Sequence, residues 1–480
     1  MNYKMIFHTV GRVILLEAAL LIAPLIVACL YGENCYLAFL YTIAIAAVTG
    51  FALSKLCRTE KKNIHIRDGF LIVALSWVGI SLIGAFPFVF SGEIPSFIDA
   101  LFETVSGITT TGASILDDVE SMSHGLLFWR SFTHWLGGMG VLVFIMAIMD
   151  KAPDRSINIL RAEMPGHSVD KLVPTAKSTA KILYYIYIGL TVLETIFLLC
   201  GGMPLFASVV HALGTAGTGG FGIKADSIGS YSHYLQWVIT VFMLLFGVSF
   251  NMYYLLLLRK WRPVVASNEL RCYLGLALVS FAIIAINIYP VYGSVADCVR
   301  LSAFQVSSLV TTTGYATADF NLWPQLSRGV LFLLMFVGGC MGSTSGGFKI
   351  SRLVVLAQVA RNEVRRSLNP RAVNSVKLNG RALDATAEKG ILSYLVLYLA
   401  VILSVFLIIS FEPFGFETNF TAAVSCVNNI GPGFDLIGPA ASYSCYSGFS
   451  KLVLSVAMLM GRLEIYPMLL LFNPRIWAKR

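Results

Sequence analysis

The sequence predicts an all-α membrane protein in which two N-terminal helices precede four parallel repeats arranged around one axis. Three observations predict this fold class. The chain of 480 residues is 57% hydrophobic and only 13% charged, which excludes an ordinary soluble domain. Apolar stretches long enough to cross a bilayer recur along its whole length. A short polar phrase that ends in glycine returns four times, with roughly one hundred residues between copies.

Ten transmembrane helices are expected from these apolar stretches, and the first two lie near residues 12–31 and 36–56. Lys4 and Arg12 precede the first stretch as in a signal peptide, but its length favours an uncleaved helix. The other eight helices form four pairs, near 69–91 and 125–149, 181–201 and 233–258, 273–292 and 326–358, and 390–411 and 450–472.

These pairs divide the chain into an N-terminal extension and four repeats. The chain crosses the membrane twice within each repeat and so returns to the side on which it started. All four repeats therefore begin on the same side and are parallel rather than inverted. The expected boundaries are 1–67 for the extension, and 68–179, 180–271, 272–388 and 389–480 for the four repeats.

The distribution of basic residues predicts the orientation in the membrane. Alternation through the spans places 29 of the 35 Lys and Arg residues on the side that holds the N-terminus. Such asymmetry is typical of cytoplasmic segments, so both termini are expected in the cytoplasm and the net charge of +9 does not indicate a nucleic-acid partner. The opposite face carries thirteen acidic residues, among them Glu103, and five basic ones, among them Arg130. An acidic entrance concentrates cations.

A segment too short to cross the bilayer lies between the two spans of each repeat. Backbone that enters the membrane without spanning it must be buried in protein or line water. Four such segments that converge on one axis satisfy this requirement and enclose a single pore. The expected re-entrant helices are 96–109, 204–216, 303–310 and 420–427.

Each re-entrant helix leads into one copy of the repeated phrase, and a ring of backbone carbonyls at this place is suited to binding a dehydrated cation. Glycine permits the unusual backbone angles that such a ring requires. The alternative is four ordinary glycine caps at helix ends. The predicted filter residues are Thr110, Thr111 and Gly112; Gly217, Thr218 and Gly219; Thr312, Thr313 and Gly314; and Asn429, Ile430 and Gly431.

The second span of the third repeat contains a glycine-rich stretch that is not expected to stay helical. We interpret it as a loop that lies across the pore beneath the filter, and the alternative is close helix packing through glycine. The predicted gate-loop residues are Gly338, Gly339, Gly342, Ser343, Thr344, Ser345, Gly346 and Gly347.

Charged residues inside the spans suggest a barrier in the pore. Arg462 in the last span is interpreted as an electrostatic barrier to cations, and the alternative is a salt bridge with Glu464 or with another helix. Glu17 and Glu194 are single acids in other spans. With Glu464 they leave open a proton- or sodium-coupled symporter.

Neither an enzyme nor a nucleotide-binding chain is expected. The phrase Gly217–Gly222 fits G-x-G-x-x-G, but a re-entrant helix precedes it where a strand is required. The spans contain no nucleophile–base pair and no metal-binding constellation, and the nine cysteines are scattered singly.

Taken together, these segments resemble the Trk/Ktr/HKT superfamily of potassium transport proteins, and within it the bacterial TrkH/TrkG type, which has two additional N-terminal spans. The resemblance covers essentially the whole chain. It rests on Phe102–Gly107 leading into Thr109–Ala113, on Thr218–Phe221, on Asn428–Gly433, on the glycine-rich stretch 338–347, on Val376–Gly380 and on Gly461–Glu464.

The resemblance implies a homodimer in the lipid of a bacterial inner membrane, with one potassium pore in each protomer. It also implies a cytosolic ring of nucleotide-binding TrkA-like subunits that controls the gate. In the family the loop matching 338–347 is the gate, and the arginine matching Arg462 lines the pore. Plant relatives that favour sodium have serine at the position of Gly112, so glycine here favours potassium. A sodium-preferring or non-selective channel of the same fold stays open, because the second and fourth phrases depart from the threonine pattern.

Overall fold

The computed structural model describes residues 2–58, 66–140, 176–370 and 375–474. The extension contains α1 (Tyr3–Leu20), α2 (Ile22–Tyr31) and α3 (Tyr36–Leu56). The first repeat contains α4 (Ile66–Gly84), α5 (Phe86–Ser91), α6 (Phe97–Ile108) and α7 (His124–Gly138). The second contains α10 (Ala176–Cys200), α11 (Leu205–Gly217), α12 (His233–Phe246), α13 (Phe250–Leu257) and α14 (Trp261–Val265). The third contains α15 (Asn268–Asn287), α16 (Tyr289–Tyr292), α17 (Val295–Val310), α18 (Gln325–Leu334), β1 (Val337–Gly338), β2 (Phe348–Lys349), α19 (Ile350–Leu368), β3 (Lys377–Leu378) and β4 (Arg381–Ala382). The fourth contains α20 (Ala385–Ile409), α21 (Phe416–Asn428), α22 (Gly448–Arg462) and α23 (Tyr466–Leu471), and short 3-10 turns lie at Phe320–Leu322, Asp435–Ile437 and Tyr443–Cys445.

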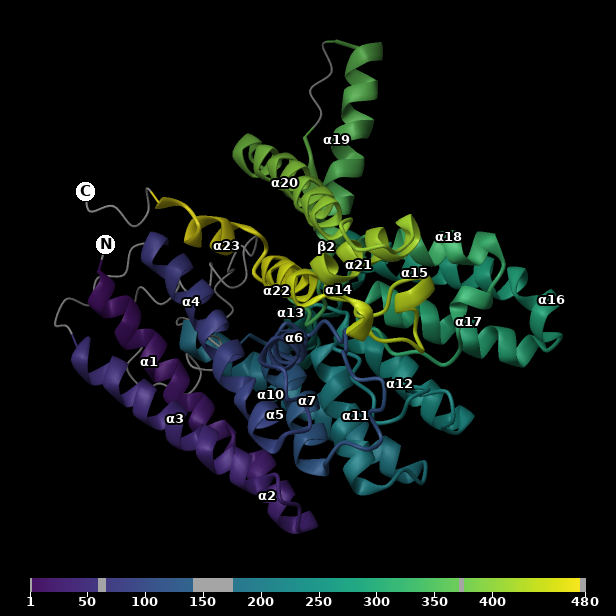
Figure 1. Cartoon of the computed structure of the whole chain (residues 1–480). Coiled ribbons are helices and arrows are strands. Elements are labelled where there is room, and N and C mark those ends of the chain that lie inside the picture. Colours follow the sequence, from purple (N-terminus) through teal and green to yellow (C-terminus); the bar gives the residue numbers. More distant parts are fainter. Residues whose placement is uncertain (1, 59–65, 141–175, 371–374, 475–480) are drawn as a thin grey trace.

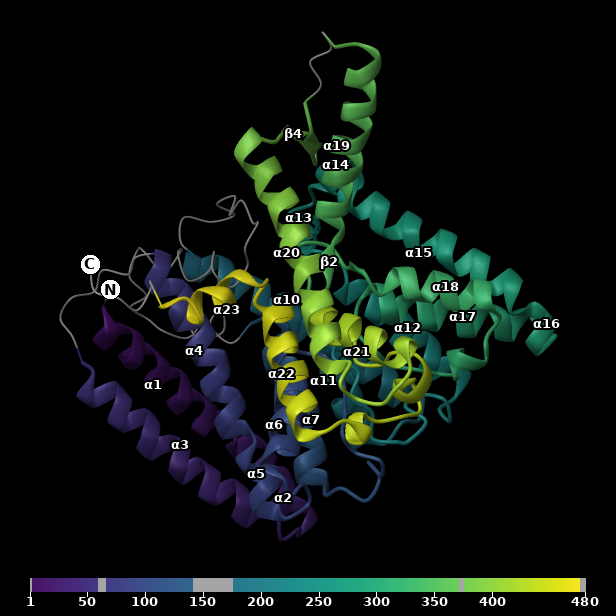
Figure 2. The same cartoon turned by 45° about the horizontal axis from the view of Figure 1, so that its top comes forward.

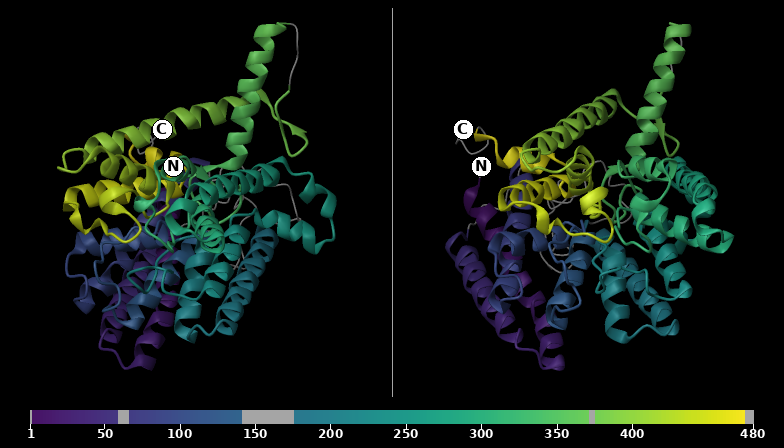
Figure 3. Two further views of the ribbon diagram at one scale, coloured as in Figure 1. Left: turned by 90° about the vertical axis from the view of Figure 1, so that its right-hand side faces the viewer. Right: turned by 45° about the vertical axis from the view of Figure 1, so that its right-hand side comes forward.

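The four repeats surround a common centre, and the extension packs at the edge of the molecule against the first repeat (Figures 1 and 2). The helix α19 and the β3–β4 hairpin project from the body on one side (Figure 3). The first element, α1, begins on the same side as the last, α23, ends (Figure 1). The expected architecture of an extension followed by four parallel repeats is therefore confirmed.

The four re-entrant helices are α6, α11, α17 and α21. The predictions for the first two match the structure closely, but α17 begins at Val295 and α21 at Phe416, earlier than expected. Their first turns contain polar residues, Asp297 in α17 and Glu417 in α21, which the hydrophobic pattern had excluded. Acidic residues are favourable at this end because the helix dipole is positive there. Ser96 and Ser294 begin α6 and α17 by accepting a hydrogen bond from a backbone N–H of the first turn.

The second span is interrupted in the second, third and fourth repeats, which the sequence predicted only for the third. In the described residues six helices are long and apolar enough to cross a membrane, and the pair α12–α13 adds a seventh although it bends by 90°. The helix α7 ends at Gly138, and the rest of its predicted span lies outside the described residues. The other two second spans are divided between α18 and α19 and between α22 and α23.

Glycines at these interruptions allow the second spans to touch the ends of the re-entrant helices. A Cβ on Gly137 would meet the Ile108 carbonyl, and one on Gly461 would meet the Val427 carbonyl. A Cβ on Gly247 would lie 2.7 Å from the Thr311 side chain. A larger residue at these positions would push the second span away from the centre.

Close glycine packing also fixes the N-terminal extension. A Cβ on Gly11 of α1 would lie 2.8 Å from the Gly50 carbonyl oxygen of α3, and a Cβ on Gly50 would lie 2.9 Å from the Gly11 oxygen. The His8 ring adds a 2.6 Å contact between its Nδ1 and the Ser54 carbonyl.

We expect Gly50→Leu to separate α1 from α3 and to lower the stability of the protein by about 1–3 kcal/mol through overpacking. The measurement is the midpoint of thermal unfolding in detergent. Gly390→Leu in α20 is the matched control, because a Cβ there meets nothing within 4 Å. Equal midpoints for the two variants would contradict the packing described here.

Candidate selectivity filter and gate

The loops that follow the four re-entrant helices share one backbone conformation. Thr110, Thr218, Thr312 and Asn429 each have a positive φ of 55–56°. This left-handed conformation is costly for β-branched residues such as threonine, so the surrounding structure must hold it. The next residue in each loop donates its N–H back to the last helical turn: Thr111 to Ser106 (2.8 Å), Gly219 to Gly214 (3.0 Å), Thr313 to Ser308 (2.8 Å) and Ile430 to Ser425 (3.0 Å).

A glycine with positive φ follows two residues after each left-handed residue. These glycines are Gly112, Gly220, Gly314 and Gly431. The predicted register of the second loop was therefore wrong by one residue, since Gly220 and not Gly219 corresponds to Gly112. The error arose because two glycines follow Thr218 in tandem and the Thr-Gly match selected the first of them. Gly217 is the last residue of α11.

The four loops close into a ring through these glycines. A Cβ on Gly112 would collide with the Gly219 carbonyl oxygen, one on Gly220 with that of Thr313, and one on Gly314 with that of Ile430. The circle is completed by Gly431, whose Cβ would lie 2.7 Å from the Thr111 oxygen. Each glycine thus abuts the carbonyl that precedes the equivalent glycine of the next loop.

This ring also decides between the two interpretations of the repeated phrase. In each loop the left-handed residue that ends the helix is threonine or asparagine, and the glycine lies two residues beyond it. The glycines are therefore not the caps of the re-entrant helices. They are required because neighbouring loops approach so closely that no side chain fits between them.

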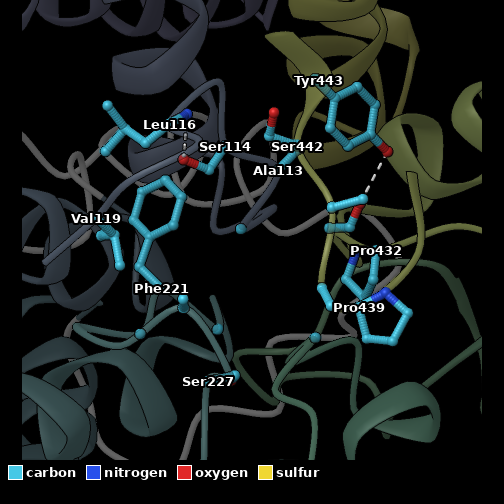
Figure 4. Close-up of a pocket in the computed structure, with 18 of the residues that line it drawn as sticks. Ala113, Ser114, Leu116, Val119, Phe221, Ser227, Pro432, Pro439, Ser442 and Tyr443 are labelled. Atoms are coloured by element: carbon cyan, nitrogen blue, oxygen red, sulfur yellow. Dashed lines mark hydrogen bonds between the residues drawn. The ribbon is translucent and has the colours of Figure 1, made fainter. Parts of the chain in front are cut away.

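An outer cavity of about 350 Å³ opens on one side of the ring. Gly112, Gly220, Gly314 and Gly431 all line it, together with residues of the surrounding loops that include Phe221, Ser227, Pro432 and Tyr443 (Figure 4). The Tyr443 hydroxyl and the Ser425 hydroxyl each donate to the Gly431 carbonyl at 2.8 Å. That carbonyl is therefore occupied by protein donors and is a poor candidate for binding an ion.

A buried ion pair that the sequence did not reveal stabilises the ring by contacting the loops of the first and second repeats. The Arg130 Nε donates to the Glu103 carboxylate at 2.8 Å, and the two side chains are 3% and 0% exposed. Glu103 also accepts from Ser114, and the Arg130 guanidinium lies 4.0 Å from the centre of the Phe221 ring. Arg130 further donates to the Gly222 carbonyl. Both residues were expected at an acidic outer entrance. Arg130 does line the outer cavity, although it is only 3% exposed, whereas Glu103 is fully buried behind it, and together they link the first two loops.

His134 forms a second link between the same loops. Its Nδ1 lies 2.7 Å from the Gly107 carbonyl of α6, and its Nε2 accepts the Phe221 N–H at 3.3 Å. The two bonds together require a neutral ring with the proton on Nδ1. This role could not be predicted from the sequence, because a single histidine in a span carries no recognisable pattern.

On the other side of the ring lies the glycine-rich stretch of the third repeat, which is not helical, as predicted. Its ends pair as the short parallel strands β1 and β2, with Gly338 opposite Lys349. The Gly346 N–H donates to the Thr312 hydroxyl at 2.6 Å, so the stretch touches the filter loop directly. A cavity of about 90 Å³ below the ring is lined by Gly342, Ser343, Ser345, Gly346 and Gly347 among others.

The same stretch satisfies the backbone groups exposed at the bend between α12 and α13. The Gly247 carbonyl accepts the Cys340 N–H at 2.9 Å, and the Phe250 N–H donates to the Gly342 carbonyl at 3.0 Å. Inside a membrane such groups need protein partners. The bend of the second repeat and the loop of the third therefore stabilise each other.

Arg462 joins this loop to the first repeat. Its guanidinium donates to the Thr344 carbonyl at 2.8 Å and to the Gly137 and Gly138 carbonyls at 2.6 and 2.7 Å. Glu464 pairs with Arg352 of α19. Arg462 and Glu464 both line the cavity below the ring.

The other two acids considered at the sequence level lie away from both cavities. Glu17 is buried beside Ile80, Ile108 and Trp129 in an apolar pocket of about 20 Å³, and Glu194 is buried in α10. Neither is among the residues that line the space on either side of the ring.

We expect Glu103→Gln to destabilise the protein by about 3–5 kcal/mol, because it leaves the Arg130 charge buried without its partner. The readout is the thermal unfolding midpoint in detergent. Glu417→Gln is the matched control, since Glu417 and its partner Arg328 are 49% and 24% exposed and such pairs contribute about 1 kcal/mol or less. If the unfolding midpoint of Glu103→Gln is no lower than that of the control, the Glu103–Arg130 pair does not stabilise the ring.

Known proteins resemble this chain in sequence and in fold. The family described as "TrkH: Cation transport protein" matches residues 32–479. The Trk system potassium uptake protein TrkG of Escherichia coli (strain K12) is 33% identical over 99% of both chains. The Trk system potassium uptake protein TrkH of Salmonella typhimurium is 35% identical over 100% of both chains. The crystal structure of the potassium transporter TrkH from Vibrio parahaemolyticus covers 100% of both chains with a TM-score of 0.89 and 30% identity. With the whole length matched in sequence and in structure, the chain belongs to the TrkH family of cation transport proteins.

Proposed function

We propose that this protein carries potassium ions across the membrane as the membrane subunit of a Trk-type uptake system. The observation that carries the proposal is the closed ring of four glycine loops between an outer and an inner cavity. Backbone carbonyls in such a ring can replace the hydration shell of a monovalent cation. The TrkG and TrkH relatives are named for potassium uptake by a Trk system.

The ligands of the ion are the carbonyls of the two residues that precede each ring glycine. The candidates are those of Thr110 and Thr111, Thr218 and Gly219, Thr312 and Thr313, and Asn429 and Ile430. All eight residues are buried, and the negative ends of the four re-entrant helix dipoles favour a cation near them. In this assignment the carbonyls from the second loop are those of Thr218 and Gly219, whereas the sequence alone suggested Gly217 and Thr218.

The stretch 338–347 acts as the gate in this proposal, and Arg462 is the barrier below the filter. Support comes from the contact of Gly346 with the Thr312 hydroxyl and from the three carbonyls that hold the Arg462 guanidinium. A fixed positive charge on the pathway opposes cation flow until it moves aside.

The assembly follows from the same proposal. A homodimer lies in a bacterial inner membrane, with both termini and α19 in the cytoplasm and one pore per protomer. The chain divides at residues 67, 179, 271 and 388, and it works with a cytosolic nucleotide-binding partner of the TrkA type. Supporting observations are the excess of Lys and Arg on the predicted cytoplasmic side and the projection of α19 and the β3–β4 hairpin from the body of the protein (Figure 3).

The proposal predicts that Gly220→Ala abolishes most potassium uptake, because the new Cβ collides with the Thr313 carbonyl at a φ of 75°. Uptake into proteoliposomes at a set membrane voltage is the measurement. Gly329→Ala in α18 is the control, since a Cβ there meets nothing within 4 Å. Purified wild-type protein that carries no potassium under any voltage, with or without sodium, would overturn the proposed function.

Arg462→Gln is expected to increase potassium flux in the absence of any cytosolic partner. The change removes the charge that holds the Thr344, Gly137 and Gly138 carbonyls together. Losing charge-assisted hydrogen bonds of this kind weakens the closed state by about 1.5–3 kcal/mol for each bond. Unchanged basal flux in a folded variant would show that Arg462 is structural and not a barrier.

A further inference from the structure

A second cation, Lys349, contacts the gate loop beside Arg462. Lys349 forms the end of β2 and directly precedes α19. Its side chain is only 9% exposed, and it lines the cavity below the ring together with Arg462 and Glu464. The Lys349 ammonium donates to the Ser345 carbonyl. Two successive carbonyls of the loop, those of Thr344 and Ser345, are thus each held by a protein cation.

The two carbonyls lie next to the filter loops, which places the Lys349 ammonium close to the proposed ion pathway. The next residue, Gly346, donates its N–H to Thr312 at 2.6 Å, and a Cβ on it would lie 3.0 Å from the Asn429 Cβ. The Ser345 carbonyl is therefore one residue away from contacts with two different filter loops. A cation that left the inner end of the ring would meet this part of the loop first.

The chemistry of lysine fits this place. Its ammonium is a compact point charge with three donors, and it takes oxygen ligands as a monovalent metal ion does. The charges that act on it come from several elements: the acids Glu464 and Glu269 attract it, and Arg462 and Arg352 repel it. Its ammonium is held by one loop carbonyl, and α19 begins at the next residue, so a movement of α19 displaces it.

We propose that Lys349 is a tethered competitor of the permeating ion. Its ammonium occupies the Ser345 carbonyl in the closed state, and conduction requires it to withdraw toward the cytoplasm with the start of α19. The inference deepens the proposed function and rests on it. A purely structural role is the competing explanation, because Lys349 also lies beside Gly338 in the pairing of β1 and β2.

Voltage separates the two explanations. A tethered cation on the cytoplasmic side is drawn away from the ring when the interior is negative, and it is driven toward the ring when the interior is positive. The basal current of the wild type should therefore be larger inward than outward. If Lys349 only stabilises the loop, its removal raises the current by the same factor in both directions.

The experiment records potassium currents from giant bacterial spheroplasts, which keep the native orientation, without the cytosolic partner. Lys349→Met should raise the basal outward current by about tenfold or more, since one charge-assisted hydrogen bond is lost, and should reduce the rectification. Lys349→Arg should retain the rectification because it keeps the charge. Lys389→Met in α20 is the control for loss of an exposed lysine. Lys349→Gln carries the same test if the methionine variant fails to assemble.

Each outcome decides a separate question. Equal increases in both directions, or no increase in a folded variant, would overturn the competitor role of Lys349 while leaving potassium transport intact. Currents in the wild type that do not exceed those of Gly220→Ala would instead count against the proposed function itself. A double variant, Lys349→Met with Arg462→Gln, should lose more rectification than either single variant, because the two cations hold different carbonyls.

Discussion

The contact between a glycine of one loop and a backbone carbonyl of the next is the constraint on which the rest of the structure depends. It recurs four times and closes on itself, from Gly112 through Gly220 and Gly314 to Gly431. No residue with a Cβ fits at these positions, so the loops reach van der Waals contact only as bare backbone. This close approach places carbonyl oxygens from four distant parts of the chain around one axis. It also explains why left-handed threonines are tolerated, since each loop is held by its neighbours on both sides.

The interrupted second spans follow from this ring. A straight helix would cover the space below the filter, whereas a helix that ends at Gly138, Phe246, Leu334 or Arg462 leaves it open. Every interruption exposes backbone groups that lipid cannot satisfy. Several of these groups form hydrogen bonds with another repeat. The backbone of Cys340 and Gly342 in the third repeat bonds to the backbone at the bend between α12 and α13, and the Arg462 guanidinium of the fourth repeat donates to the carbonyls at the end of α7. The inner half of the pore is thus a network of mutual backbone bonds rather than four independent helices.

The sequence was sufficient for the architecture because the signals were long and periodic. Apolar spans, the excess of basic residues on one side and the four glycine phrases predicted the repeats and the non-helical stretch 338–347. The register of the second loop was missed because Gly219 and Gly220 are equivalent as letters, and only the backbone angles and the collision with Thr313 distinguish them. The Glu103–Arg130 pair was missed because each residue alone reads as an exposed charge near a loop, and their partnership joins residues far apart in the chain.

In the proposed gating role of the stretch 338–347, its attachments determine how it can move. It is bonded to the second repeat through Gly247, to the filter through Thr312, and to the first and fourth repeats through Arg462. Because all four repeats contribute, the loop cannot shift without breaking contacts on several sides at once, which favours two discrete arrangements over gradual deformation. Its C-terminal end continues without a linker into α19, whose far end projects away from the body (Figure 3). A force applied to that helix therefore reaches Lys349 and Arg352 first, and through the Arg352–Glu464 pair it reaches the segment that carries Arg462.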